Sequence, residues 1–482
     1  MGRWIALVLL PVSAAAVDLP EAIRAAAQRD PGVQAAGIRL LELDGAAQAA
    51  QGPFDLVGDF TLTTGLGSQI DDFRGNRVSL DRQTVGIEAA LSQRLVWGTT
   101  LTASFTNSYA TGDTFNLQTL ELGTQDTWQS GLGLQVRQPL LRGFGREINT
   151  LAQAQVEAAD RVAQAQQRVT VAAVVQEVVV VWAELAYAEA NVRIRQRALE
   201  LALTQKSSAS RQVEGGRMAP VDLAVVEQAV AEREQALFVA QQAVAQRQAE
   251  LQVRTGLKVE TAVLPEAPAW LQTQETTAAD ALKANFDLLV VDAELESQRM
   301  RLPALRNDTR AQLDLTVGAN HAGVDDTFTG GLSTLPDNQS YGASLRLGLP
   351  FQNRAAEGEL YQAEKALERA HAQRAGRVQA IQLEVDQALR ALRTAEQAQG
   401  LALRVFELAE KSLAAEQRRL ELGRATQLDV LEVSQKSAEA ALSVERARAD
   451  RVLAAARLQA LTGRLLEAYG IVVEARTLVG AP

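Results

Sequence analysis

The stretch that decides the fold is Glu214-Gly-Gly-Arg-Met-Ala-Pro-Val-Asp222, because it returns as Glu421-Leu-Gly-Arg-Ala-Thr-Gln-Leu-Asp429. Around it, residues 211–256 align with residues 418–463 at a constant offset of 207 residues without a gap, and 15 of the 46 positions are identical. Part of this identity reflects the alanine and glutamine bias of helical sequence, but the Gly-Arg-x₄-Asp pattern and the closing Thr-Gly do not. Each copy predicts a helix that ends at glycine, a tight turn and a long returning helix. The chain is therefore a duplicated unit.

The composition excludes several classes of function. The 482 residues leave room for two or three ordinary domains, yet only 4% are aromatic and alanine is abundant, which favours close-packed helices over a large globular core. A net charge of −10 with no basic tract argues against a nucleic-acid partner. The chain has no cysteine, and its two histidines, His321 and His371, are far apart in sequence. The sequence therefore predicts no catalytic residues, no metal site and no cofactor.

Residues 1–16 predict a secretory signal peptide. They contain one basic residue, a short apolar core, and the small residues Ala14 and Ala16, so cleavage is expected after Ala16. A buried N-terminal helix is the alternative. Without cysteine, the mature N-terminus cannot carry a lipoprotein acyl anchor. The best later apolar run, Val169–Val181, is interrupted by Gln176 and Glu177, so we expect an exported chain without a membrane-spanning helix.

Between Phe54 and Leu140 the apolar period changes from helical to two, which predicts strands. Four segments alternate apolar and polar residues in this first repeat, and two do so in the second. They start at Phe54, Val85, Leu101, Leu132, Leu313 and Tyr341. The expected connections are a short turn at Trp97-Gly98, glycine-rich polar loops at Ser68–Arg82 and Thr111–Thr124, and a polar loop at His321–Gln339.

Long helical hairpins follow each strand region. From Arg146 to Val213 there is no proline, which at 1.5 Å per residue predicts a helix of roughly 100 Å if unbroken. Pro220 suits the first turn of the returning helix. In that helix an apolar residue recurs every seven positions, at Val230, Leu237, Val244 and Leu251. An ordinary amphipathic helix rarely passes about 25 residues, so we expect coiled-coil-like hairpins.

These patterns predict the domain boundaries. Residues 1–16 are the signal peptide, residues 258–277 a linker and residues 464–482 a tail. Repeat 1 comprises residues 17–257, with strands at about 54–139 and a helical hairpin at 146–254 whose tip lies near 215–220. Repeat 2 comprises residues 278–463, with strands at about 310–349 and a hairpin at 352–463 whose tip lies near 423–427. Each repeat opens with a helix, Leu19–Gln51 broken at Asp30 in the first and Ala279–Leu302 ended by Pro303 in the second. Pro139 and Pro350 mark the strand-to-helix junctions.

So few strands cannot close a membrane barrel alone, although a β-structure in lipid has to close. We therefore expect the strands to be completed by other copies of the chain, and the long hairpins to pack side by side around a central space. The predicted fold class is mainly α with membrane β, a helical barrel continuous with a transmembrane β-barrel. Of the 21 aromatic residues, 11 fall within the two strand regions, as in the aromatic girdles of outer-membrane barrels. The preference of aromatic residues for strands is the alternative explanation.

The order of helix, strands, proline and long hairpin, made twice, resembles the TolC-type outer-membrane efflux and secretion channels. The resemblance covers Leu19–Gly463. It is carried by the two tips and by the junction segments Leu134-Gln-Val-Arg-Gln-Pro-Leu-Leu-Arg-Gly143 and Leu345-Arg-Leu-Gly-Leu-Pro-Phe351. It implies a homotrimer with a β-barrel in outer-membrane lipid and a helical tunnel across the periplasm. It also implies a periplasmic adaptor and an inner-membrane pump of the RND or ABC type, and a passive conduit rather than an enzyme.

One feature departs from the family, whose members usually give two strands per repeat, four per chain. The first repeat here offers four alternating segments. Either Val85–Tyr109 adds an extra hairpin or the barrel is wider, and the sequence does not decide between these.

The resemblance also assigns roles to residues at the two tips. Carboxylates at the positions of Asp429 and Glu432 ring the periplasmic mouth of such channels, and Asp222 is the counterpart of Asp429 in the first copy. Helix capping is the alternative, because Thr426-x-x-Asp429 fits a capping pattern and acids suit the first turn of a helix. The expected adaptor-docking residues are Gly215, Gly216, Arg217, Gly423 and Arg424. Their alternative is a helix C-cap followed by a solvated arginine.

A second class of function is an exported trimeric coiled-coil structural protein, such as an adhesin stalk. It would need one strand-rich anchor at one end of the chain, whereas the predicted strands lie inside each of the two repeats. Drug, metal and protein export are not distinguished by this sequence, because partners outside the chain choose the cargo. The neighbouring genes would distinguish them.

Overall fold

The computed structural model describes residues 17–73, 76–116, 121–262, 264 and 278–473. The predicted signal peptide, most of the predicted linker and the last residues of the predicted tail lie outside the described residues. The chain divides into two compact units, each made of segments from both repeats. Unit 1 comprises Met1–Leu41, Arg161–Asp292 and Ala372–Pro482, and unit 2 comprises Glu42–Asp160 and Ala293–His371.

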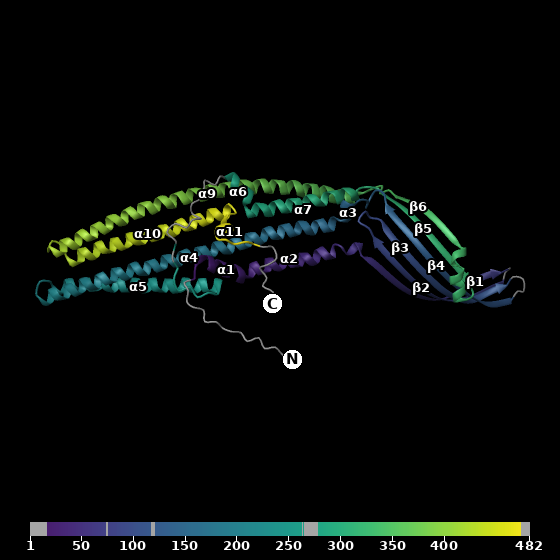
Figure 1. Ribbon diagram of the computed structural model, residues 1–482, viewed down its shortest axis with the longest axis horizontal. Coiled ribbons are helices and arrows are strands. Elements are labelled where there is room, and N and C mark those ends of the chain that lie inside the picture. Colours follow the sequence, from purple (N-terminus) through teal and green to yellow (C-terminus); the bar gives the residue numbers. More distant parts are fainter. Residues whose placement is uncertain (1–16, 74–75, 117–120, 263, 265–277, 474–482) are drawn as a thin grey trace, which may run out of the picture. The chain divides into compact units, whose positions relative to one another are not determined.

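Unit 2 is built on one antiparallel sheet, which over the described residues has the order β1-β2-β3-β4-β5-β6 (Figure 1). The strands are β1 (Leu56–Phe73), β2 (Asn76–Arg94), β3 (Thr100–Asn116), β4 (Glu121–Pro139), β5 (Gln312–Asp325) and β6 (Gln339–Gly348). The first four come from repeat 1 and the last two from repeat 2, so the pairing of β4 with β5 joins the repeats in a single sheet. The extra hairpin that the sequence left open is present, because β2 and β3 pair with each other and lie between β1 and β4.

The strands are longer than the sequence predicts, and two predicted loops are wrong. Ile70 pairs with Ser79 and Thr114 pairs with Gly123, so much of Ser68–Arg82 and of Thr111–Thr124 belongs to strand pairs. Strand pairing depends on backbone hydrogen bonds, which polar residues and glycine form as well as apolar residues do. The alternation of apolar and polar residues therefore predicts only the part of a strand that carries an apolar face, and misses the strand ends, which are polar.

The two faces of the sheet differ in chemistry. Residues paired across neighbouring strands share a face, and successive residues along a strand alternate between faces. One face carries large apolar side chains, of which those of Phe60, Leu66 and Leu134 are 71%, 84% and 64% exposed. The other face carries small and polar residues, such as the paired Thr63 and Gly86. A continuous exposed apolar face is rare in water and is usual on the lipid side of a membrane barrel.

A short helix covers part of the apolar face, where the predicted polar loop at His321–Gln339 is wrong. β5 continues to Asp325 and is followed by α8 (Phe328–Ser333) and the 3₁₀ helix η3 (Leu335–Asp337). The Thr327 hydroxyl caps α8 by accepting a hydrogen bond from the Gly330 amide (3.1 Å). The ring of Phe328 stands edge-on to that of Trp128 in β4, with centroids 5.3 Å apart. Capping and packing form this helix, and six residues are too few to show a helical period.

The remaining described elements are helical. They are α1 (Leu19–Arg29), α2 (Pro31–Ala49), η1 (Gly52–Phe54), α3 (Arg146–Asn149), α4 (Leu151–Glu214), α5 (Pro220–Thr255), α6 (Ala278–Ala284), α7 (Phe286–Asp308), α9 (Arg354–Glu421), α10 (Gln427–Leu461) and α11 (Leu465–Ala468). Two predicted boundaries are wrong. Pro303 lies inside α7 instead of ending it, because a proline removes a single backbone donor and packing can carry the helix past it. The helix expected from Arg146 is interrupted at Thr150, which separates α3 from α4.

The buried core of unit 1 repeats with the sequence offset. One apolar cluster contains Val178 and Leu251, together with residues of α1 and α11. A second cluster contains Val385 and Leu458, together with residues of α6 and α7. These are the same two positions 207 residues later. The duplication therefore extends from the hairpin tips back along α4 and α9.

Among the described residues, one helix is long and apolar enough to cross a membrane by length and composition, although the sequence predicts none. This helix is α4. Of its apolar window, 56% is buried inside the structure. Buried core helices pass the same test, so α4 is explained by the core that it forms with α1 and α11.

Candidate functional site

The two hairpin tips have the same backbone turn. Gly216 and Gly423 both adopt the left-handed conformation, with φ of 67° and 71°. In each tip the glycine amide donates to a carbonyl three residues back, and the next amide donates to one five residues back. The bonds are Gly216 N–H to Val213 O (3.0 Å), Arg217 N–H to Gln212 O (2.8 Å), Gly423 N–H to Leu420 O (2.9 Å) and Arg424 N–H to Arg419 O (2.8 Å). This Schellman motif satisfies the last carbonyls of α4 and α9 and favours glycine at the turn.

The expected adaptor-docking residues are all exposed. They are Gly215, Gly216, Arg217, Gly423 and Arg424. A Cβ atom placed on Gly216 or Gly423 would meet no atom within 4 Å, so the space in front of both turns is open. This exposure suits a docking surface, and it suits a plain C-cap with a solvated arginine equally well. The structure therefore shows the cap, and docking is a proposal.

Asp429 forms a helix cap, which is one of the two roles that the sequence predicts for it. The Thr426 hydroxyl accepts a hydrogen bond from the Asp429 amide (3.2 Å), and the Asp429 carboxylate accepts one from the Thr426 amide (2.7 Å). The pair is a capping box at the start of α10. The backbone and side-chain hydrogen bonds from Thr426 lower the pKa of Asp429 below its usual 3.8, because they stabilise the ionised form. The carboxylate is exposed and charged, so capping and a place at a pore mouth are compatible.

The other two expected gate carboxylates have different surroundings. Glu432 accepts a hydrogen bond from the Lys436 ammonium one turn further along α10 (2.8 Å), which offsets part of its charge. Asp222 lies in the first turn of α5, whose N-cap residue is Ala219 and makes no side-chain cap hydrogen bond. Alanine stands here where the second repeat has Thr426, so Asp222 is not part of a capping box. Its position suits the helix dipole only.

A buried contact holds the two repeats together near the tips. Leu431, in the second turn of α10, packs in an apolar cluster with Val230 of α5 and Ala202 of α4. The Gln427 side chain donates a hydrogen bond to the Ser208 hydroxyl (3.2 Å). The start of α10 therefore packs against α4 and α5, so Asp222 and Asp429 lie on adjoining helices.

Arg233 takes part in the same contact and was not identified from the sequence. Its guanidinium donates a hydrogen bond to the backbone oxygen of Leu431 (2.8 Å). Burial lowers the pKa of Arg233. Comparison of the two repeats could have identified it, because the position equivalent to Arg233 in the second copy is Ala440. A charge present in only one copy marks a contact that the two copies do not share.

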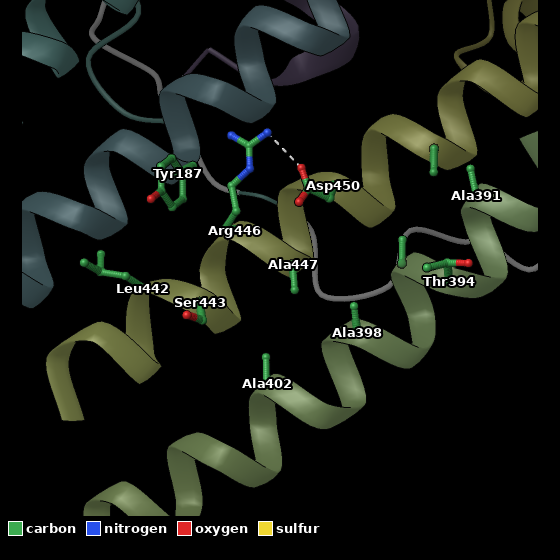
Figure 2. A pocket seen from close by; sticks show the side chains of 12 residues that line it. Tyr187, Ala391, Thr394, Ala398, Ala402, Leu442, Ser443, Arg446, Ala447 and Asp450 are labelled. Carbon is green, nitrogen blue, oxygen red and sulfur yellow. Dashed lines mark ion pairs between the residues drawn. The ribbon is translucent and has the colours of Figure 1, made fainter. Parts of the chain in front are cut away.

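A groove lined mainly by alanine lies between α9 and α10, with a volume of about 850 Å³. Figure 2 shows Arg446 of α10 between the ring of Tyr187 and the carboxylate of Asp450. Arg446 also pairs with Glu184 of α4 (2.9 Å), and its guanidinium lies 5.5 Å from the centre of the Tyr187 ring. The alanines that line the groove are Ala391, Ala395, Ala398, Ala402, Ala447 and Ala454. Such short side chains allow another helix to approach closely.

The two strand-to-helix junctions are held by backbone bonds and ion pairs. Past Pro139, the Leu140 amide donates to the Leu313 carbonyl (2.7 Å), which extends the β4–β5 pairing. Arg137 pairs with Asp314 across the same two strands (2.6 Å). At the second junction, which contains Pro350, the Asn353 side chain donates to the Thr309 carbonyl (3.2 Å). These bonds fix where the strands end.

The chain was compared with known families and structures. Residues 277–464 match the family model described as outer membrane efflux protein. CusC, described as forming a transmembrane channel, has 12% sequence identity, is covered over 93% of both chains and has a TM-score of 0.65. A membrane protein from Pseudomonas aeruginosa has 15% identity, coverage of 93% of this chain and 91% of its own, and a TM-score of 0.65. The outer membrane protein VceC from Vibrio cholerae has 17% identity, coverage of 92% and 96%, and a TM-score of 0.61. No curated protein matches the sequence.

The family match over residues 277–464 and the fold agree on what this chain resembles. The resemblance to TolC-type outer-membrane channels that the sequence predicts is confirmed, and so is the fold class of long helices with a β domain. The location is accordingly the outer membrane, with the helices in the periplasm. At a coarse level, the family match and the fold support an outer-membrane efflux duct. Over the described part of the chain, no group of three or more His, Cys, Asp and Glu side chains could hold a metal ion.

Proposed function

We propose that three copies of this chain form a passive outer-membrane duct that works in tripartite efflux or in type I secretion. The observation that carries the proposal is the sheet of unit 2. Its apolar face is exposed, and its outer strands β1 and β6 each pair on one side only within the described residues. In lipid, a free edge leaves unsatisfied N–H and C=O groups, so the sheet has to close with further copies. The resemblance to TolC-type channels supplies the number three.

The long hairpins would then line a periplasmic tunnel, and the boundaries of the two repeats would be 17–257 and 278–463. We propose that a periplasmic adaptor docks at the tips, at Gly215, Gly216 and Arg217 in the first copy and Gly423 and Arg424 in the second. These residues are exposed, as a docking surface requires. An inner-membrane pump of the RND or ABC type would supply the energy, because nothing in a passive duct does so.

The alternative is an exported trimeric coiled-coil structural or adhesin protein. Such a protein would anchor itself through strands at one end of the chain. Here the sheet takes β1 to β4 from repeat 1 and β5 and β6 from repeat 2, which supports the duct. Planar-bilayer recordings separate the two functions, because a duct conducts ions and an anchored stalk does not.

The test is the assembly of the purified protein. We expect detergent-extracted protein to have the mass of three chains by native mass spectrometry. On heating, the trimer and the β contribution to the infrared amide band should disappear at the same temperature, because the strands close only in the assembly. A folded monomer that keeps its β signal would overturn the proposal.

A further inference from the structure

We propose that three copies of the chain close into a barrel of eighteen strands, in which β6 of one copy pairs with β1 of the next. This assembly rests on the trimeric duct proposed above, and it fixes how the wall is built and how wide it is. The described residues give six strands in each copy, all in one sheet. Among the strands of the described residues, none is left over that could lie outside the wall.

The two free edges are suited to each other in direction. Every neighbouring pair in the sheet is antiparallel, and the order is the sequence order. With an even number of strands among the described residues, β1 and β6 run in opposite directions. Placing β6 of one copy beside β1 of the next therefore continues the antiparallel alternation without a defect. The same step repeated closes a ring.

The two edges are also suited to each other in chemistry. On β1 the side chains of Phe60 and Leu62 lie on the apolar face, and on β6 those of Tyr341 and Leu345 do so. All four are more than half exposed. The opposite faces carry Thr and Ser residues along both strands. Pairing the edges therefore makes one unbroken apolar belt toward lipid and one polar surface toward the lumen.

The additional hairpin is part of the wall. β2 is paired with β1 from Asn76 to Gln93 on one side and with β3 from Arg82 to Arg94 on the other. Leu62 lies opposite Ile87, and Ala89 lies opposite Phe105, so the apolar face continues across the hairpin. A hairpin folded away from the wall would have lost one of these two registers. It would also have exposed an apolar surface to water.

The consequence is a wide exit. With strands about 4.8 Å apart and tilted by about 40°, eighteen strands give a backbone diameter of about 36 Å, against about 24 Å for twelve. A barrel of this width would not exclude bulky or macromolecular cargo by size. Selection by size would fall to the periplasmic end.

Disulfide cross-linking tests the wall, because the chain has no cysteine of its own. Only directly adjacent strands bring two Cβ atoms within disulfide reach. One set of double variants combines Phe60→Cys or Leu62→Cys with Tyr341→Cys, Ala343→Cys or Leu345→Cys. A matched set combines Ala103→Cys or Phe105→Cys of β3 with the same three β6 positions. The positive control pairs Leu132→Cys with His321→Cys, which lie opposite each other in one chain.

We expect oxidation to give covalent trimers from at least one β1–β6 pair and from no β3–β6 pair. Covalent trimers from β3–β6 pairs would mean that β1 and β2 lie outside a twelve-stranded wall. An intrachain disulfide between Phe60→Cys and Leu132→Cys would mean that β2 and β3 lie outside it. If the positive control forms and every β1–β6 pair fails, the proposed pairing is wrong.

Electron cryomicroscopy of the trimer in lipid nanodiscs gives the strand count directly. Eighteen strands are expected, and twelve would overturn the inference. Both results leave the trimer intact, so they differ from a failure of the duct itself, which native mass spectrometry would show as the absence of a trimer.

Discussion

Glycines with the same backbone conformation at the ends of the long helices have different surroundings. Gly423 and Gly463 are both left-handed, with φ of 71° and 69°. A Cβ on Gly423 would face open space, whereas one on Gly463 would overlap the backbone carbonyl of Ala284. Ala284 is at the end of α6, next to Asn285, whose side chain donates a hydrogen bond to the Leu461 carbonyl (2.7 Å). The Gly463 turn is therefore packed where α6 and α10 end, and a backbone carbonyl cannot move aside as a side chain can.

We expect Gly463→Ala to destabilise the protein more than Gly423→Ala does. Forcing alanine into the left-handed conformation costs about 1–2 kcal/mol at either position. At Gly463 the collision with Ala284 adds to this, for a total of about 3 kcal/mol or more. The measurement is thermal unfolding of the purified trimers by circular dichroism at 222 nm. Equal melting temperatures for the two variants would contradict the close approach at Gly463.

At the scale of residues, the part of the site that could be predicted is the part that depends on residues close together in the sequence. The tip glycines and the Thr426–Asp429 cap are set by residues within one helical turn, so a short sequence pattern reveals them. The contact of Arg233 with Leu431 joins residues 198 positions apart, and no local pattern encodes it. Asp222 looks like Asp429 in the alignment, yet one substitution, Ala219 for Thr426, removes its capping box.

At the scale of elements, the alternation of strands and long helices was predictable because each has its own apolar period. The strand ends were not, since polar and glycine residues continue the pairing of β1 with β2 and of β3 with β4. The helix end predicted at Pro303 is wrong for a related reason. A proline predicts a helix end from local chemistry, and the packing of α7 overrides it.

The hairpin tips are the elements on which adaptor docking depends. We expect the double variant Gly216→Leu and Gly423→Leu to abolish export while trimers still reach the outer membrane. The new side chains have room, because no atom lies within 4 Å of either Cβ position, but they would stand in the docking surface. Export is measured as loss of accumulated cargo from the host, and trimers by immunoblot of outer membranes.

The control for the tip variants is Gly400→Leu, at an exposed glycine inside α9 that also has no atom within 4 Å of its Cβ position. It should leave export unchanged. Normal export by the double tip variant would show that the glycines serve only as C-caps. Loss of trimers in that variant would point to folding instead of docking, and charge reversal of the exposed Arg217 and Arg424 would then test docking without backbone strain.

At the scale of the whole molecule, the sequence predicts that the strands need partners, because it shows too few of them to close alone. It could not give the sheet order, since the pairing between β4 and β5 joins residues that lie 175 (Pro139 and Asp314) to 197 (Trp128 and Asp325) positions apart in the chain and leaves no local trace. The order matters most, because it leaves β1 and β6 at the edges and so determines how copies meet.

Assembly also decides what the tip carboxylates do. In a trimer, threefold symmetry brings together three copies of Asp429 and of Glu432, and we propose that they favour cations at the periplasmic mouth. The capping bonds lower the pKa of Asp429. Its carboxylate should therefore stay ionised at neutral pH and at the usual aspartate pKa, and lose its charge only as the pH falls through the lowered pKa. The part of the cation selectivity that Asp429 supplies should therefore persist from neutral pH to below 3.8, the usual pKa of an aspartate.

Planar-bilayer recordings of three variants separate a gate from a cap. The double variant Asp429→Ala and Glu432→Ala should lower cation selectivity and weaken block by multivalent cations, because it removes six charges from the trimer. Thr426→Ala breaks the capping box and keeps the carboxylates, so it should lower stability by about 1 kcal/mol and leave selectivity unchanged. Lys436→Gln frees Glu432 from its ion pair, so it should raise cation selectivity. If the double variant loses stability only, as Thr426→Ala does, and Lys436→Gln conducts like the parent, Asp429 is a helix cap and the mouth is gated by something else.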